Sequence, residues 1–284
     1  MNILVLGASG MLGNAVVRVL SENPDNVVYG TLRAQSSKQF FETNIAERLL
    51  ANVDVEHYDS LTQAFAFSQP DVVINCIGLV KQLAEANDVL QAIPINTLLP
   101  HRLAKLCELA GARLIHMSTD CVFNGSKGNY TEQDTSDAND LYGKSKFLGE
   151  VDYPNAITLR TSIIGHELQS KHGLLDWFLS QEAQCKGYTK AVFSGVPTVV
   201  LAHIIRDVVI PRNDLHGVYH VAAEPISKFD LLKLIAAVYG KAIEILPDNQ
   251  LVIDRSLNAE RFCKATSYIT PDWQAMVKLM YKYK

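Results

Sequence analysis

The feature that most limits how this chain can fold is a set of three glycines, Gly7, Gly10 and Gly13, directly after the apolar residues 3–6. The apolar residues indicate a buried strand, and the spacing of apolar positions over residues 11–20 indicates a helix. A strand, a tight turn and a helix in this order form the first unit of a dinucleotide-binding sheet. Gly7 permits the turn, Gly10 lets backbone amides approach a pyrophosphate, and Gly13 allows close packing of helix on strand.

Short apolar runs alternate with amphipathic segments through the first 160 residues. Several of these runs lack polar alternation, which is typical of parallel strands buried on both faces. The repeated β-α-β order predicts an α/β fold with a doubly wound parallel (Rossmann) sheet. The predicted strands are residues 3–6, 27–32, 53–56, 72–77, 113–117 and 156–159, and the predicted helices are residues 11–20, 61–67, 98–110 and 142–151.

The pattern changes after residue 160, where a smaller C-terminal substrate lobe is predicted. We expect residues 1–162 to form the dinucleotide-binding domain, with residues 196–224 returning to it. Residues 163–195 and 225–284 then form the substrate-binding lobe. Helices are predicted at residues 173–181, 203–210, 229–239 and 273–281, and strands at residues 191–193 and 218–221, the second of which is expected to rejoin the sheet.

Composition limits the cellular context and the partners. A formal net charge of −4 argues against a broad nucleic-acid-binding surface. The five cysteines are scattered without a Cys-x-x-Cys pair, which indicates reduced thiols rather than a disulfide frame or a zinc site. No apolar run approaches the roughly 18 residues of a membrane span, and no basic segment precedes the glycines as in a cleavable signal. We therefore expect a cytoplasmic protein that has neither nucleic-acid nor membrane partners.

The end of the second predicted strand bears on the choice of cofactor. Residues 29–33 contain no Asp or Glu that would accept hydrogen bonds from a free ribose 2′-hydroxyl. Arg33 is instead suited to pair with a 2′-phosphate, and Thr31 to add a hydrogen bond. This pattern favours NADP(H) over NAD(H). The alternative is that Arg33 is a solvated loop cation, since single charges are common in loops.

Tyr142 and Lys146 are one helical turn apart, so their side chains share a helix face. A lysine ammonium at this distance is expected to favour the phenolate and lower the tyrosine pKa, which suits Tyr142 to proton transfer. Thr119 follows the fifth predicted strand, at the carboxyl edge where ligands of such sheets bind. Its hydroxyl is predicted to hold a substrate carbonyl oxygen. Ser118 is the structural competitor, because either hydroxyl could be buried and bonded to the backbone.

Asn96 precedes a predicted helix and has two interpretations. Asparagine is a strongly preferred N-cap residue, so Asn96 could simply begin that helix. It could also position a water molecule in a proton relay to the tyrosine and lysine. Local sequence does not separate these two roles.

Over most of its length the chain resembles the extended short-chain dehydrogenase/reductases, and within them the dTDP-4-dehydrorhamnose reductase group. The similar segments are residues 7–13, 54–55, 75–78, 118–125, 142–146, 159–162 and 194–198, with Asn96 as the helix asparagine and Cys121 replacing a usual tyrosine. The resemblance assigns Thr119, Tyr142, Lys146 and Asn96 to catalysis. It implies that, besides the loop glycines, Thr31 and Arg33, the cofactor contacts are Ser9, Met11, Asp54, Val55, Cys76, Gly78 and Lys146.

The resemblance implies an NADPH-dependent reductase of a nucleotide-linked 4-keto-6-deoxysugar, in which the tyrosine supplies the proton. Candidate substrate contacts are Ser118, Asp120, His166 and Thr198. His166 could equally be a solvated loop residue, because loops lie at the surface. We find no counterpart of the acidic metal ligands sometimes associated with the rhamnose enzyme and predict no metal. A homodimer through exposed helices is plausible for the superfamily, although no apolar stripe in the sequence predicts one.

Two alternative functions remain open. An epimerase or dehydratase of the same superfamily would cycle the hydride internally. A dehydratase usually has an acid/base pair beside the threonine, and Cys121 after Asp120 is no obvious partner. The other alternative is a non-catalytic NADP-binding regulatory subunit, such as that of methionine adenosyltransferase, which resembles these reductases. The intact set of Thr119, Tyr142 and Lys146 argues against this second option.

Overall fold

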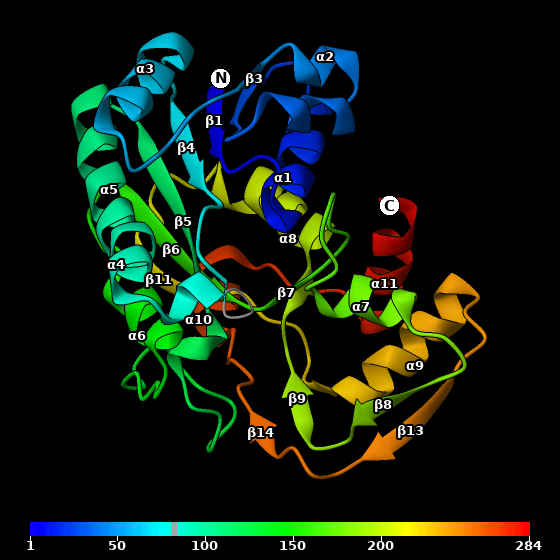
Figure 1. Cartoon of the computed structure of the whole chain (residues 1–284). Coiled ribbons are helices and arrows are strands. Elements are labelled where there is room, and N and C mark those ends of the chain that lie inside the picture. Colours follow the sequence, from blue (N-terminus) through cyan, green and yellow to red (C-terminus); the bar gives the residue numbers. More distant parts are fainter. Residues whose placement is uncertain (81–83) are drawn as a thin grey trace.

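The centre of the molecule is a parallel sheet, seen in a computed structural model that describes residues 1–80 and 84–284 (Figure 1). Within those residues the sheet has seven strands in the order β11-β6-β5-β4-β1-β2-β3, and its neighbouring strands pair in parallel. This order confirms the predicted doubly wound α/β fold. The strands are β1 (Asn2–Leu6), β2 (Val27–Thr31), β3 (Leu49–Leu50), β4 (Val72–Asn75), β5 (Arg113–Thr119), β6 (Ala156–Thr161) and β11 (Gly217–His220).

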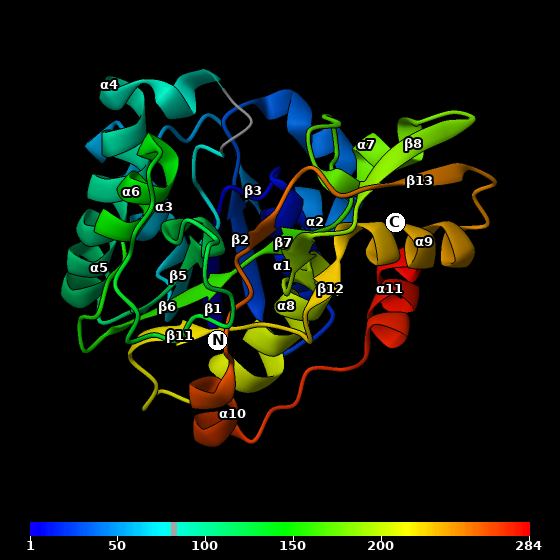
Figure 2. The same cartoon turned by 90° about the horizontal axis from the view of Figure 1, so that it is seen from below.

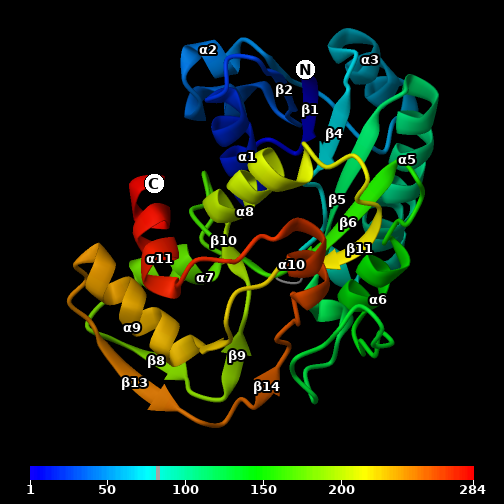
Figure 3. The same ribbon diagram turned by 180° about the vertical axis from the view of Figure 1, so that it is seen from behind.

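Helices cover both faces of this sheet (Figures 1 and 3). On one face, α1 (Met11–Ser21) and α8 (Thr198–Ile204) pack side by side. On the other face lie α3 (Tyr58–Ser68), α5 (Leu99–Ala110) and α6 (Leu141–Leu148). Both faces of the strands are therefore removed from water, which explains why the strand sequences are apolar without alternation. The sheet is thus a rigid base whose carboxyl edge can carry a site.

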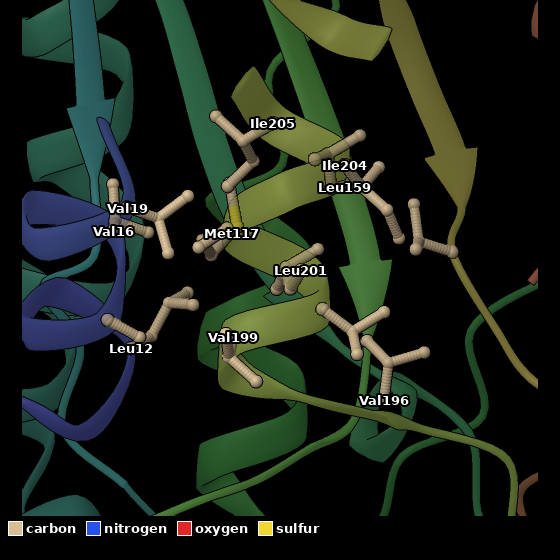
Figure 4. Packing of buried hydrophobic residues seen from close by; sticks show 14 of the residues in the cluster. Leu12, Val16, Val19, Met117, Leu159, Val196, Val199, Leu201, Ile204 and Ile205 are labelled. Atoms are coloured by element: carbon tan, nitrogen blue, oxygen red, sulfur yellow. The ribbon is translucent and has the colours of Figure 1, made fainter. Parts of the chain in front are cut away.

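The face under α1 and α8 contains the larger apolar core (Figure 4). Val16 of α1, Met117 of β5 and Leu201 of α8 converge there. Val16 and Leu201 are completely buried. The same cluster extends without interruption to Leu231 of α9 (Lys228–Tyr239) and Val277 of α11 (Trp273–Lys282), so one core joins the sheet to the C-terminal lobe.

The C-terminal lobe lies beyond the carboxyl ends of the strands (Figures 1 and 2). Small sheets hold it together, and α9 packs on β8 and β13. The lobe elements are β7 (Ile163–Ile164), α7 (Leu174–Ser180), β8 (Gln184–Tyr188), β9 (Ala191–Phe193), β10 (Val196–Pro197), β12 (Ile226–Ser227), α9, β13 (Glu244–Asp248), β14 (Ile253–Asp254), α10 (Glu260–Thr266) and α11. The expected return of a late strand is found, because β11 pairs with β6 through Gly217–Ile157 to His220–Arg160. The exact lobe boundaries stay a prediction.

One predicted strand is wrong. Residues 53–56 form a turn, and the third strand is β3, which pairs with Gly30 and Thr31 of β2. The chain leaves the strand direction at Asn52, whose φ of 60° is left-handed. The amide of His57 then closes the turn on the carbonyl of Asp54 at 3.2 Å.

Two shorter elements frame the later site. A π-helical turn, η3 (Ile93–Leu98), precedes α5, and a 3₁₀ turn, η4 (Asp120–Val122), follows β5. The helix predicted at residues 203–210 begins earlier, as α8, and ends in the π-helical turn η5 (Ile205–Val209). π-Helical turns are often found at functional sites, and η3 packs directly against α6.

Candidate active site

The glycine loop has the shape that a dinucleotide cradle needs. Gly7 has a φ of +81°, a conformation that other residues rarely adopt. A Cβ on Gly13 would lie 2.1 Å from the Gly7 carbonyl oxygen, so only glycine lets α1 start this close to the loop. Gly10 is the N-cap of α1 and no side chain caps this helix. The backbone amides at its N-terminus can therefore bind an anion such as a pyrophosphate.

Thr31 supports this loop from below. Its hydroxyl accepts a hydrogen bond from the Gly7 amide at 3.1 Å, and its carbonyl accepts one from the Ala8 amide at 3.0 Å. With 2% exposure, Thr31 is buried under the loop. We had expected this hydroxyl to bind a ribose phosphate directly. Its position indicates that it shapes the cradle, and a direct bond to a ribose phosphate stays a prediction.

The segment after β4 lies between the cradle and Lys146. A Cβ on Gly7 would lie 2.8 Å from Ile77, while a Cβ on Gly78 would lie 3.8 Å from Lys146 Nζ. The glycine loop and Lys146 are therefore both neighbours of this short segment. Cys76 lies in this segment, and burial raises the pKa of its thiol to about 12, so the side chain is an uncharged part of it.

The residues expected at the adenosine end lie at the surface. Arg33 and Asp54 are exposed, Val55 is half-buried against the apolar cluster under α3, and Ser9 is half-buried at the loop. The pKa of Asp54 is lowered mainly by the hydrogen bond from the Glu56 amide, and Arg33 contributes to the same shift. Arg33 and Asp54 are therefore electrostatic neighbours beside the end of β2.

Met11 lies under the first long loop of the lobe. A Cβ added to Gly173 would be 2.7 Å from Met11 Cε, so residues 165–173 pass next to the start of α1. Gln169 Nε2 also donates to Ser37 Oγ at 3.5 Å, which brings the same loop to the chain after β2. The cradle is thus bordered by the lobe on this side. Lys171 and His172 are exposed on this loop.

Helix α6, which carries Tyr142 and Lys146, is fixed at both ends. Asp140 caps the helix by accepting a hydrogen bond from the Gly143 amide at 2.7 Å. A Cβ at Gly143 would lie 2.2 Å from the Cys121 carbonyl oxygen, and one at Gly149 would lie 1.9 Å from the Asn96 carbonyl oxygen. Only glycines allow the helix to approach η4 and η3 this closely.

Tyr142 and Thr119 meet at the carboxyl end of β5. The two side chains lie close enough together for the Thr119 hydroxyl to lower the pKa of the Tyr142 phenol. The Thr119 hydroxyl also donates to Asp120 Oδ1 at 3.1 Å and accepts from the Cys121 amide at 3.1 Å. Burial raises the pKa of Asp120, and burial together with the nearby Cys121 raises the pKa of Tyr142. The phenol is therefore protonated at neutral pH.

Lys146 is buried to 5% exposure, and its ammonium donates to the Met117 carbonyl at 2.7 Å. Burial lowers the pKa of Lys146 to about 8, and Glu150 partly offsets this effect. The expectation that Lys146 lowers the Tyr142 pKa differs from the structure, in which that pKa is raised. The physical reason is the orientation of the ammonium toward the β5 backbone and the desolvation of the phenol.

Asn96 is not the N-cap that one interpretation of its local sequence predicted, and its role in a proton relay stays a prediction. It lies inside η3 and is completely buried, so it does not cap a helix. Its side-chain oxygen accepts from the Leu79 amide at 2.9 Å, and its nitrogen donates to the Leu79 carbonyl at 3.2 Å and to Ser145 Oγ at 3.2 Å. The Asn96 side chain thus connects the segment after β4 to helix α6.

Three predicted substrate contacts, Ser118, His166 and Thr198, have other partners or neighbours in the structure. Ser118 donates its hydroxyl to Glu150 Oε1 at 2.6 Å and is 6% exposed, so it is committed to a buried carboxylate. His166 shares a hydrogen bond of 2.9 Å with the Tyr239 hydroxyl. Together with Thr198, His166 borders a small cavity between α1, α8 and α11 that none of Thr119, Tyr142 and Lys146 lines. Asp120 is the substrate candidate that the structure brings to the hydroxyls of Thr119 and Tyr142.

Two cations of the lobe reach this site without having been predicted. Arg255 Nε donates to the Phe123 carbonyl at 2.7 Å, and its Nη1 lies 3.8 Å from Cys121 Sγ. Both Arg255 and Lys228 act electrostatically on Asp120. They come from separate lobe segments far along the chain, so no local motif identifies them.

Within residues 1–80 and 84–284, His, Cys, Asp and Glu side chains do not gather in threes that could hold a metal ion. In the same part of the chain, no helix combines the length and the apolar character needed to cross a bilayer.

A glycine cradle at β1, a Tyr/Lys pair on α6 and a threonine at the end of β5 define a protein of the short-chain dehydrogenase/reductase type. The family model described as "RmlD substrate binding domain" matches residues 1–282. The chain therefore belongs to the RmlD substrate binding domain family.

Similar proteins include both enzymes and a subunit of another enzyme. A dTDP-4-dehydrorhamnose reductase of Aggregatibacter actinomycetemcomitans is 27% identical over 258 residues, which cover 86% of this chain and 82% of that protein. Methionine adenosyltransferase 2 subunit beta of Danio rerio is 28% identical over 265 residues, which cover 88% of this chain and 76% of that protein.

Solved structures agree with the fold over the full length. The crystal structure of a hypothetical dTDP-4-dehydrorhamnose reductase from Sulfolobus tokodaii has a TM-score of 0.78 and 25% identity and covers 97% of this chain and 99% of its own. A dTDP-4-dehydrorhamnose reductase from Bacillus anthracis in complex with NADP has a TM-score of 0.78 at 19% identity, with 99% and 98% coverage.

Proposed function

We propose that this protein is an NADPH-dependent reductase that acts on the ketone of a nucleotide-linked 4-keto-6-deoxysugar. The observation that carries the proposal is the proximity of the Tyr142 phenol to the Thr119 hydroxyl at the carboxyl edge of the sheet. Lys146 lies one helical turn from Tyr142, and the segment after β4 lies between it and the glycine loop. Similarity to the reductase of A. actinomycetemcomitans supports the choice of a nucleotide-sugar substrate.

In the proposed reaction, a bound nicotinamide supplies the hydride. Tyr142 donates its hydroxyl proton to the carbonyl oxygen, and its raised pKa keeps this proton in place at neutral pH. The Thr119 hydroxyl orients the same oxygen, because it lies near enough to the phenol to influence its pKa. The Lys146 ammonium can donate to ribose hydroxyls from its buried position and so align the cofactor.

NADP(H) is proposed as the cofactor because of the charge at the end of β2. Arg33 is exposed there and can pair with a 2′-phosphate. Its neighbour Asp54 has its carboxylate bonded to the Glu56 amide and to His57, so that carboxylate is less available to a ribose hydroxyl.

The direct test is NADPH oxidation with a panel of nucleotide 4-keto-sugars, followed by product analysis. We expect stoichiometric NADPH consumption with at least one of these compounds. Tyr142→Phe removes the proton donor and should lower kcat/KM by about 10²–10⁴-fold while leaving the Kd for NADPH nearly unchanged.

Tyr153→Phe is the matched control, because the Tyr153 hydroxyl bonds His101 of α5. This variant should keep wild-type kcat/KM. The proposal is wrong if no compound in the panel supports NADPH oxidation, or if Tyr142→Phe turns over like the wild type.

A second function, a non-catalytic NADP-binding regulatory subunit, is supported by the similarity to methionine adenosyltransferase 2 subunit beta. It predicts NADPH binding without turnover, together with co-elution with a methionine adenosyltransferase catalytic subunit in gel filtration. An epimerase or dehydratase instead predicts turnover with catalytic amounts of cofactor. Cys121 stands beside Asp120 where such a dehydratase would need a base, which disfavours that reaction.

A further inference from the structure

A buried carboxylate connects the catalytic helix to the strand that carries Thr119. The Glu150 side chain is 5% exposed and follows the end of α6. Its Oε1 accepts hydrogen bonds from Ser118 Oγ and from Arg160 Nε, each at 2.6 Å. Its Oε2 accepts from Arg160 Nη2, also at 2.6 Å. Ser118 immediately precedes Thr119 in β5, and Arg160 lies in β6.

The guanidinium of Arg160 is held on its remaining sides. Its Nη1 lies 3.2 Å from His220 Nε2 in β11, and its centre lies 5.3 Å from the Phe123 ring centroid. His220 Nδ1 lies 3.1 Å from the Tyr130 carbonyl oxygen, which fits a neutral ring that donates there and accepts from Arg160. Burial lowers the pKa of His220 to about 3, so the ring stays neutral.

We propose that Glu150 is a positioning residue that holds Lys146 and Thr119 in their active arrangement by joining α6 to β5 and β6. The inference rests on the proposed function, because it concerns the same catalytic groups. Glu150 contacts neither catalytic side chain through a hydrogen bond seen here. It acts through the helix that carries Lys146 and through Ser118, the neighbour of Thr119.

The charge of Glu150 also has an electrostatic effect on Lys146. Desolvation lowers the Lys146 pKa, and Glu150 is the nearby group that raises it. Among the other groups facing Lys146, the Met117 carbonyl of β5 is neutral and accepts a hydrogen bond from the ammonium, and the pKa of His116 is held well below its ordinary value by burial and by Lys146 itself. From η3 and the segment after β4, neutral Asn96 and Gly78 approach. Glu150 therefore keeps the ammonium charged near neutral pH.

The test is the pH dependence of Glu150→Gln, which preserves shape and removes the charge. Lys146 acts as an ammonium, so affinity for NADPH and kcat/KM should fall as pH rises through its pKa of about 8. In the variant this alkaline limb should move down by about one pH unit, which makes both quantities about tenfold lower above pH 8. NADPH affinity is read by fluorescence titration from about pH 6 to about pH 10, so activity is not the sole readout.

Glu108→Gln is the matched control. It removes the same charge from an exposed pair with Lys105, in which both side chains are 60% exposed, and should leave the limb in place. Glu150→Asp should restore most of the wild-type limb, because it keeps the charge. If Glu150→Gln does not fold, the paired variant Glu150→Gln with Arg160→Gln leaves no buried charge unmatched and should show the same shift.

An alkaline limb in Glu150→Gln, or in the paired variant, that coincides with the wild-type limb would overturn this inference while leaving the reductase proposal intact. A wild-type protein that binds no NADPH at any pH would overturn both together. A purely structural role for Glu150 predicts lower stability in all buried variants with an unmoved limb, and this result would also count against the inference.

Discussion

At the scale of single residues, the two cations of the candidate cofactor site differ in their burial. Lys146, at 5% exposure, lies against the β5 backbone, whereas Arg33 lies at the surface beside the end of β2. A buried ammonium is weakly hydrated and responds to one nearby carboxylate. An exposed guanidinium keeps its full charge and can meet a phosphate arriving from solvent. The two cations therefore suit different parts of one dinucleotide.

Arg33→Ala should reduce affinity for NADPH while leaving affinity for NADH unchanged. Loss of a charge-assisted bond to the 2′-phosphate costs about 1.5–3 kcal/mol, which corresponds to roughly 10–150-fold in Kd. Titration of the protein with both cofactors, followed by fluorescence, measures the change.

Arg102→Ala on α5 serves as the control, because this arginine is also exposed but lies on the helix that covers the other face of the sheet. It should alter neither Kd. An Arg33→Ala variant that keeps its preference for NADPH would show that Arg33 is only a solvated loop cation.

At the scale of elements, α6 is a short helix whose position depends on contacts rather than on its own stability. It spans Leu141–Leu148, and glycines on either side of Lys146 let it touch η4 and η3. Helices of this length are marginal in isolation. The alignment of Tyr142 with Thr119 therefore depends on these close approaches.

Gly149→Ala should push α6 away from η3, because the added Cβ would lie 1.9 Å from the Asn96 carbonyl oxygen. We expect a loss of about 1–3 kcal/mol in the free energy of unfolding and a decrease in kcat/KM. Denaturant unfolding and steady-state kinetics measure the two effects.

The comparison for this helix is Lys144→Ala, which changes an exposed side chain of α6. It should leave both quantities close to wild type. If Gly149→Ala retained normal stability and turnover, the close approach of α6 to η3 would not be what positions the catalytic pair.

The sequence predicted the elements with strong periodicity and missed those that depend on distant partners. The strand at residues 72–77 and the helix at residues 11–20 were recovered because the local pattern matches the burial. The strand placed at residues 53–56 was wrong because β3 is short and is defined by its pairing with β2. The start of α8 was missed because residues 198–200 include β-branched side chains, which are typical of strands.

The same limit applies to the candidate site. Tyr142, Lys146 and Thr119 were recognised because one helix and one strand end carry them. The sequence could not tell that Ser118 bonds Glu150 while its neighbour Thr119 lies beside Tyr142, since adjacent strand residues point to opposite faces and the register decides which is which. Arg255 was not predicted because its segment is far from Cys121 in the sequence and approaches it only in the folded chain.

At the scale of the whole molecule, one apolar cluster extends from the sheet into the lobe. Leu201 of α8 is fully buried between α1 and the sheet in this cluster (Figure 4). A shared core couples the two parts, so they are expected to unfold together even though the lobe has small sheets of its own.

Leu201→Ala should lower the free energy of unfolding by about 2–5 kcal/mol and keep a single transition. Tryptophan fluorescence reports the lobe, because Trp177 lies in α7 and Trp273 in α11, and far-ultraviolet circular dichroism reports the whole chain. The two signals should change at the same denaturant concentration.

Leu109→Ala, at a side chain that is 83% exposed, is the control and should change stability by less than about 0.5 kcal/mol. Separate transitions for the two signals would show that the lobe unfolds independently. The proposed dinucleotide-binding domain and the lobe would then also differ in stability.

The pairing of β11 with β6 has a consequence for biosynthesis. Residues 162–216, which include much of the lobe, are translated between these two adjacent strands. Until His220 has left the ribosome, β6 is an open edge with unsatisfied backbone groups, the kind of surface at which nascent chains associate with one another. A stalled or truncated translation product that ends before β11 should therefore need chaperone protection that the complete protein does not.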